Sequence, residues 1–158
     1  FTCQTSTGTF GTTTQQIYVK NPDAADGGWT VSLAGSSDTA VWDSAGTDFD
    51  FNDPNSSGCV DGAGDPDSLG GQMTVDASGG SISVGSCSTC TTTGVSAGSS
   101  NSFSETVTDD ITILSGAAGS DDIGDWTLQG VSISQKVPAE QPAASDYAIN
   151  MVLSILAN

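Results

Sequence analysis

Apolar residues recur at every second position along this chain of 158 residues, which is the period of a β-strand with one buried face. The alternating positions are Ile17 and Val19, Trp29, Val31 and Leu33, Met73 and Val75, Ile82 and Val84, Val107, and Ile111 and Ile113. No window has a convincing helical stripe. The pattern therefore predicts half-buried strands throughout the chain.

Segments rich in Gly, Asp and Ser separate the predicted strands, at 21–28, 52–71 and 115–124. Such punctuation is typical of all-β sandwiches and barrels. The chain length fits one domain with its own core. We therefore expect residues 1–158 to form a single antiparallel β-sandwich with Greek-key-like connections and long acidic loops.

The alternation changes parity near Gly130. Trp126 and Leu128 occupy even positions, whereas Val131 and Ile133 occupy odd ones. A β-bulge at Gly130 would restore the register and keep all four apolar side chains on one face.

The last segment has the clearest alternation of the chain. Tyr147, Ile149, Met151, Leu153 and Ile155 share one face, and Ala148, Asn150, Val152 and Ser154 share the other. At about 3.3 Å per residue these positions span roughly 30 Å, which is long for a strand in a small domain. Two interpretations stay open. The segment is either a central strand that closes the sandwich or an assembly strand that a neighbouring subunit accepts by β-augmentation.

The net charge is −17, because 19 acidic residues stand against Lys20 and Lys136, and there is no His. This charge excludes nucleic acid and anionic membrane surfaces as partners. Nearly all the acids are Asp, which favours turns and caps over helix interiors. No apolar run reaches the length of a membrane span, so we expect no membrane-spanning segment.

The four cysteines are Cys3, Cys59, Cys87 and Cys90. An even number in a chain without His favours two structural disulfides in an oxidising compartment over a zinc or redox site. Three pairings are possible, and we prefer Cys3–Cys90 with Cys59–Cys87. The chain starts at Phe1 without an initiator Met, so we expect a mature, secreted chain, extracellular or at the cell surface, from which a signal peptide has been removed.

An acidic stretch is the main candidate for metal binding. Carboxylates and amides at alternate positions place hard oxygens on one side of an extended segment, as Ca²⁺ requires. The candidate ligands are Asp43, Asp48, Asp50, Asn52, Asp53, Asp61, Asp65 and Asp67. The stretch is not an EF-hand, because Asp53 stands where Gly is needed and Cys59 where Glu is needed. The alternative is that these acids are solvated turn residues.

A second acidic cluster gives weaker support for calcium. It consists of Asp109, Asp110, Asp121, Asp122 and Asp125. If a metal binds at either cluster, coordination replaces carboxylate repulsion and couples folding to the ion.

Catalytic residues are hard to find in this sequence. Without His there is no ordinary Ser or Cys triad, and without Arg there is no bidentate clamp for phosphate or carboxylate substrates. We therefore do not expect an enzyme. Trp29 and Trp126 lie in alternating strands and are expected in the core, whereas Trp42 beside Asp43 is the candidate for an exposed ring that stacks on sugars.

Three segments resemble the WxL-type domains of bacterial surface proteins. The run Gly28-Trp-Thr-Val-Ser-Leu33 is similar to the first tryptophan-centred strand of that family. Trp126-Thr-Leu128 and the closing segment that begins at Tyr147, after Pro142, resemble its C-terminal part. The resemblance implies a β-sandwich at a bacterial cell surface and a cell-wall-binding role.

The sequence thus favours an extracellular structural protein. We expect a subunit of a pilus-like surface filament or layer, which self-associates into a homopolymer through β-strand contacts, with Ca²⁺ reducing repulsion between acidic subunits. The alternative is a WxL-like module that binds a cell-wall polymer or glycan through Trp42 and the acidic loop.

Overall fold

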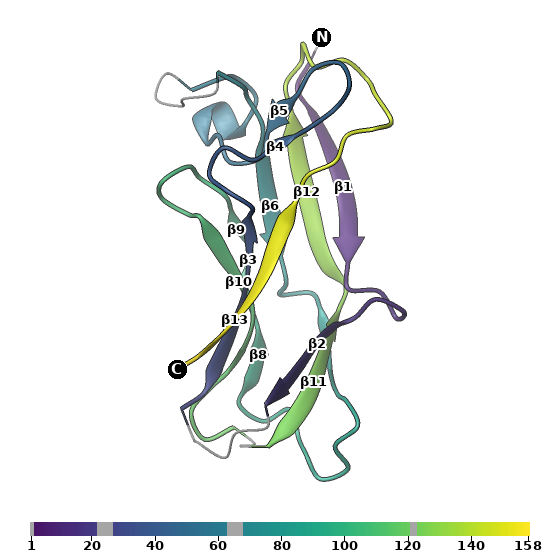
Figure 1. Cartoon of the computed structure of the whole chain (residues 1–158), viewed down its shortest axis with the longest axis vertical. Helices are drawn as coiled ribbons and strands as arrows, with labels where there is room; N and C mark the ends of the chain where they lie inside the picture. Colours follow the sequence, from purple (N-terminus) through teal and green to yellow (C-terminus); the bar gives the residue numbers. More distant parts are fainter. Residues whose placement is uncertain (1, 22–26, 63–67, 121–122) are drawn as a thin grey trace.

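The computed structural model describes residues 2–21, 27–62, 68–120 and 123–158, and strands dominate it (Figure 1). Its strands are β1 (Gln4–Phe10), β2 (Ile17–Asn21), β3 (Trp29–Gly35), β4 (Val41–Trp42), β5 (Phe49–Asp50), β6 (Gln72–Asp76), β7 (Ser81–Val84), β8 (Val95–Ala97), β9 (Asn101–Ser102), β10 (Asp110–Gly116), β11 (Gly124–Gln129), β12 (Val131–Val137) and β13 (Met151–Ala157). One short 3₁₀ turn, η1 (Asn55–Ser57), is the helical element of the described residues. In these residues no helix has the length and apolar character needed to cross a membrane.

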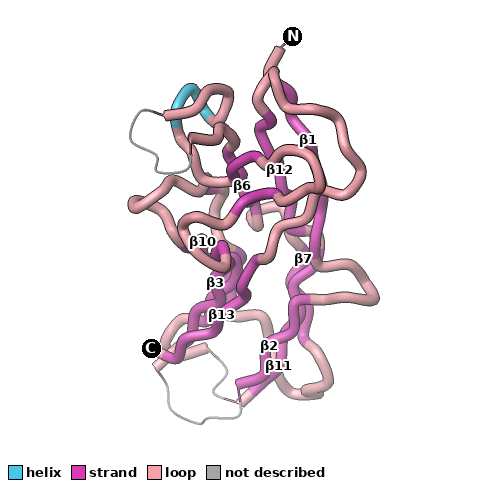
Figure 2. The backbone as a smooth tube through the Cα atoms, turned by 45° about the horizontal axis from the view of Figure 1, so that its top comes forward, coloured by secondary structure: helices cyan, strands magenta, loops and turns pink. Residues whose placement is uncertain are grey.

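The strands form two layers around one core. One layer is the sheet β13-β3-β10-β8, and the other combines the sheets β1-β12-β6-β9 and β2-β11-β7. Each pairing between these strands is antiparallel. β11 and β12 follow each other along the long axis, so that β2 and β7 flank the lower half of the molecule and β1 and β6 the upper half (Figures 1 and 2). The predicted all-β, antiparallel architecture is confirmed.

Gly130 separates β11 from β12, and the alternation of apolar positions changes parity at this residue. Its φ of +77° lies in the left-handed region, which glycine adopts without a steric penalty. Trp126, Leu128 and Val131 are all completely buried, so both parities reach the core. The predicted irregularity is present, but it ends one strand and begins another instead of forming a bulge within a single strand.

The core is a single cluster of side chains that come from both layers. Trp29 of β3 packs against Trp126 of β11 with ring centroids 5.5 Å apart, and both rings are buried as expected. Phe51 meets Phe103 edge to face at 5.1 Å, a geometry that favours the ring quadrupoles.

Two local assignments from the sequence differ from the structure. Strand β1 was not expected, because it reads Gln-Thr-Ser-Thr-Gly-Thr-Phe and is almost entirely exposed, so no apolar alternation marks it. Val107 was expected in a strand, but it lies in a turn whose backbone closes onto Ser104, and it is 79% exposed. Backbone pairing to β12 stabilises β1 in place of side-chain burial.

The closing strand is shorter than predicted, and it lies at the edge of its sheet. β13 begins at Met151, whereas Tyr147 and Ile149 precede the strand. β13 pairs with β3 and ends its sheet, so the interpretation as a central strand is wrong. β10 takes the position on the other side of β3, which leaves β13 at the edge (Figure 2).

Four cysteines form two disulfides, as predicted, but the preferred pairing is wrong. The structure joins Cys3 to Cys59 and Cys87 to Cys90. Gln4 pairs with Val137 at one end of the β11–β12 run, whereas the amide of Cys87 binds Asp125 at the other end. Those ends are roughly 40 Å apart at the rise of an extended chain, so Cys3 cannot reach Cys90.

Candidate functional site

The acidic loop contains two carboxylates that are buried. Asp50 and Asp53 are 0% and 1% exposed, the reverse of what solvated turn residues would show. Asp53 accepts hydrogen bonds from the backbone N–H groups of Asn55 and Gly62, both at 2.8 Å. Because its two oxygens bind the amides of Asn55 and Gly62, the Asp53 side chain holds these two points of the loop close together.

Other members of the predicted set also bind backbone groups. Asp48 accepts a hydrogen bond from the N–H of Ser44 at 3.0 Å, and the amide of Asn52 donates to the carbonyl of Asp38 at 3.0 Å. Asp43 contributes its backbone, through a β-bridge to Ala148.

Asp61, the remaining candidate among the described residues, does not complete a metal site. The carbonyl of Asp61 accepts a hydrogen bond from the amide of Asn55 at 2.8 Å. Asp65 and Asp67 lie outside the described residues, as do Asp121 and Asp122 of the second cluster. Among the residues that the structure describes, no group of three or more potential ligands gathers as a metal site requires. Calcium binding therefore stays a prediction.

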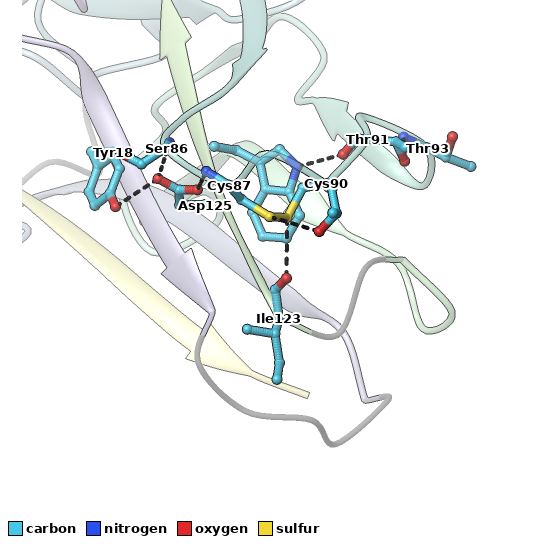
Figure 3. Close-up of a disulfide and its surroundings, with 10 residues drawn as sticks. Tyr18, Ser86, Cys87, Cys90, Thr91, Thr93, Ile123 and Asp125 are labelled. Carbon is cyan, nitrogen blue, oxygen red and sulfur yellow. Dashed lines mark hydrogen bonds between the residues drawn. A yellow bond between two sulfur atoms is a disulfide. The ribbon is translucent and has the colours of Figure 1, made fainter.

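Asp125, assigned to the second acidic cluster from the sequence, organises the Cys87–Cys90 loop instead (Figure 3). Its carboxylate accepts hydrogen bonds from the N–H of Ser86 at 2.6 Å, from the N–H of Cys87 at 2.8 Å and from the hydroxyl of Tyr18 at 3.0 Å. One feature of the sequence could have indicated this role, a charged residue inside an alternating strand between Gly124 and Trp126.

These hydrogen bonds favour the ionised carboxylate. The backbone hydrogen bond from Ser86 lowers the pKa of Asp125 most, and the bonds from Cys87 and Tyr18 and the charge of Lys20 act in the same direction. The hydrogen bond to Asp125 raises the pKa of Tyr18. A Cβ on Gly85 would collide with the Asp125 carboxylate, so the loop needs glycine there.

We expect Asp125→Asn to lower the melting temperature at neutral pH. Because the pKa is depressed in the folded state, the contribution is fully present above the ordinary Asp pKa and is lost as the pH falls through the folded value. Thermal unfolding from pH 7 down to pH 2 tests this. The difference between wild type and variant should shrink in the acidic range, and a difference independent of pH would contradict the assignment.

A groove of about 780 Å³ lies on the upper half of the molecule. Its walls come from β1, from β12 and from the segment 141–147. Ile133 and Gln135 of β12 are among its lining residues, and Trp42, Phe49 and Tyr147 form its aromatic wall. None of the described lining residues is charged, so the acidic stretch contributes Phe49 to this surface but no carboxylate among those residues.

The aromatic wall is held in place by stacking and hydrogen bonds. Trp42 stacks on Phe49 at 5.8 Å, and Phe49 meets Tyr147 edge to face at 4.9 Å. The indole of Trp42 donates to the side-chain oxygen of Gln135 at 2.9 Å, and Gln141 donates to the Tyr147 hydroxyl at 2.7 Å. Trp42 is half-buried, between the exposed ring that was predicted and a core residue.

The second notable surface is the edge strand β13. Val152, Leu153, Ile155 and Leu156 are 44%, 49%, 58% and 67% exposed. Leu153 and Ile155 lie beside Leu33 and Val31 on the core-facing side of the sheet, while Val152 and Leu156 lie on the outer side. Both faces of this strand therefore present large apolar side chains to solvent, which is uncommon on a monomer surface.

Comparison with known proteins does not assign a family. No family model matches the chain, and no curated protein or solved structure matches it.

Proposed function

We propose that this protein is an extracellular structural subunit that self-associates through β-strand contacts into a surface filament or layer. The observation that carries the proposal is the apolar edge strand β13, exposed on both faces. Edge strands of monomeric proteins usually carry Lys, Pro or a bulge that prevents pairing with another chain. β13 reads Met-Val-Leu-Ser-Ile-Leu-Ala and has none of these residues.

Two further features support an extracellular subunit. The two disulfides are typical of proteins in oxidising compartments, and they stabilise the folded chain against unfolding there. The Ser- and Thr-rich strands and the surface acids supply a hydrated exterior, so that association can be confined to a short apolar segment.

Electron microscopy combined with sedimentation velocity tests the proposal. We expect concentrated protein at physiological ionic strength to form fibres or sheets that sediment far faster than the 15.7 kDa chain. A chain that stays monomeric at all concentrations, with and without Ca²⁺, would contradict it.

Calcium enters the proposal as a counter-ion between acidic subunits. We expect CaCl₂ to promote association at constant ionic strength, because a divalent ion reduces carboxylate repulsion more than a monovalent salt does. MgCl₂ is the control, since Mg²⁺ retains its waters and adapts poorly to irregular oxygen sites. Equal effects of the two ions, or a melting temperature unchanged by EDTA, would argue against a coordinated calcium site.

The groove favours a second candidate function, a WxL-like cell-wall or glycan-binding module. Uncharged Thr, Ser and Gln side chains beside aromatic rings offer hydroxyl and amide partners together with an apolar face for a sugar ring. Its volume is that of a small-ligand site.

A pair of glycine variants tests the groove. A Cβ on Gly8, which lines the groove, and one on Gly79, which lies outside it, would each meet nothing within 4 Å. We expect Gly8→Leu to fill the groove and weaken binding of cell-wall oligosaccharides at least tenfold, while Gly79→Leu leaves it unchanged. Tryptophan fluorescence titration measures the affinity, and no saturable binding by wild type would eliminate this function.

A further inference from the structure

The outer edge of β13 presents an ordered row of backbone groups. The carbonyl of Asn150 accepts a hydrogen bond from the N–H of Ser36, and the N–H of Asn158 donates to the carbonyl of Gly28. The backbone N–H and C=O groups of the even-numbered residues therefore point toward β3. Backbone groups alternate in direction along an antiparallel strand. The N–H and C=O groups of Met151, Leu153, Ile155 and Ala157 therefore point away from β3.

We propose that β13 pairs with β13 of a second copy, antiparallel and about a two-fold axis at Ser154, which joins two sheets into one. This inference rests on the proposed function and specifies its partner and register. The joined sheet has the order β8-β10-β3-β13 followed by the same strands of the partner in reverse. A two-fold interface of this kind uses one surface twice and closes on itself, so growth from this dimer into a filament or layer requires a second interface elsewhere on the subunit.

The outward backbone groups select this register. They belong to odd positions, so hydrogen-bonded pairs must join an odd residue to an odd residue. Centring the pair on Ser154 places Leu153 opposite Ile155 and Met151 opposite Ala157, and each such pair exchanges two N–H···O bonds. A shift by two residues would leave part of each strand without a partner.

Side chains on both faces fit the same register. On the core-facing side Leu153 meets Ile155 of the partner subunit, and on the outer side Val152 meets Leu156 of the partner subunit. Each exposed apolar residue of β13 thus opposes another apolar residue, which is the arrangement that stabilises cross-strand pairs. At the axis the two Ser154 side chains face each other in a non-hydrogen-bonded pair.

Charge favours a second copy approaching along this strand. A chain with a net charge of −17 repels its copies, but β13 itself is uncharged. Its outer-face neighbours on β3 are Thr30, Ser32 and Ala34, which are uncharged as well.

Two other edges, β1 and β2, suit pairing less well. β1 presents Thr, Ser and Gly, which bury little apolar surface. β2 carries Lys20 at its edge, and an edge Lys opposes strand pairing.

A cysteine at the two-fold axis tests the register. Ser154→Cys places two thiols opposite each other at the spacing of a non-hydrogen-bonded pair, where a disulfide fits. Ser83→Cys, an exposed serine on the edge strand β7, is the control. We expect diamide to convert most of the Ser154→Cys protein into covalent dimer on non-reducing gels, and equal cross-linking of both variants would overturn the register.

A matched pair of lysine variants tests the energetics. Leu156→Lys places a charge in the apolar interface, whereas Val107→Lys changes the net charge equally at an exposed turn. We expect Leu156→Lys to raise the dimer dissociation constant at least tenfold in sedimentation equilibrium, and Val107→Lys to leave it near the wild-type value. An unchanged constant for Leu156→Lys would overturn the inference.

The outcomes separate this inference from the proposed function. Fibres that form equally well from wild type and Leu156→Lys, without cross-linking at position 154, would retain the structural function and reject this strand pair. Cross-linked dimers that never assemble further would support the strand pair and reject the filament.

Discussion

Replacing Trp126 with Ala should lower the free energy of unfolding by about 3–5 kcal/mol, as expected for truncating a large aromatic ring in a packed core. Trp126 is completely buried, packs against Trp29, and donates from its indole N–H to the carbonyl of Thr91 at 2.8 Å. The melting temperature should fall by roughly 6–20 °C in a domain of this size. Urea denaturation followed by circular dichroism measures the change.

Trp126→Phe separates packing from hydrogen bonding. Phe keeps an aromatic ring against Trp29 but loses the N–H that satisfies the Thr91 carbonyl, so an intermediate loss is expected. If Trp126→Ala were as stable as wild type, the ring could not bridge the two layers as the structure describes.

Removing the Cys3–Cys59 disulfide should have the second large effect. This bridge spans 56 residues, and the chain-entropy relation gives a stabilisation of about 4 kcal/mol for a loop of that length. The Cys87–Cys90 bridge spans 3 residues, for which the same relation gives about 2 kcal/mol. The double variant Cys3→Ser/Cys59→Ser should therefore unfold at a clearly lower denaturant concentration than Cys87→Ser/Cys90→Ser.

The ranking of these two variants is the decisive comparison. Serine replaces cysteine in both variants, so the change in side-chain chemistry is matched. The two variants differ in the length of the loop that the lost disulfide closed. Peptide mapping under non-reducing conditions establishes the pairing directly. A Cys3–Cys90 linkage in that map, or a greater loss from removing the short bridge, would contradict the structure.

The closing strand shows where sequence reasoning failed, and the acids show where it could not decide between two structures. Alternating Asp residues in 48–53 suggested oxygen ligands, but Asp50 and Asp53 are buried and the carboxylate of Asp53 accepts hydrogen bonds from loop amides. The spacing of acids does not distinguish a ligand set from carboxylates that satisfy their own backbone, because both need oxygens on a tight turn. For the closing strand, the alternation of apolar and polar residues indicated which side chains share a face. It did not indicate which strands would lie beside it.

The sequence by itself determined seven of the strands and most of the core. Period-two alternation located β2, β3, β6, β7, β10, β11 and β12, and it marked Trp29 and Trp126 as buried, because side-chain direction in a strand is a local property. Tertiary structure alone decided the disulfide partners, the edge position of β13, the groove beside Trp42 and the role of Asp125. Each of these depends on which strands lie side by side, and strand order follows from burying all the apolar faces at once rather than from any single segment.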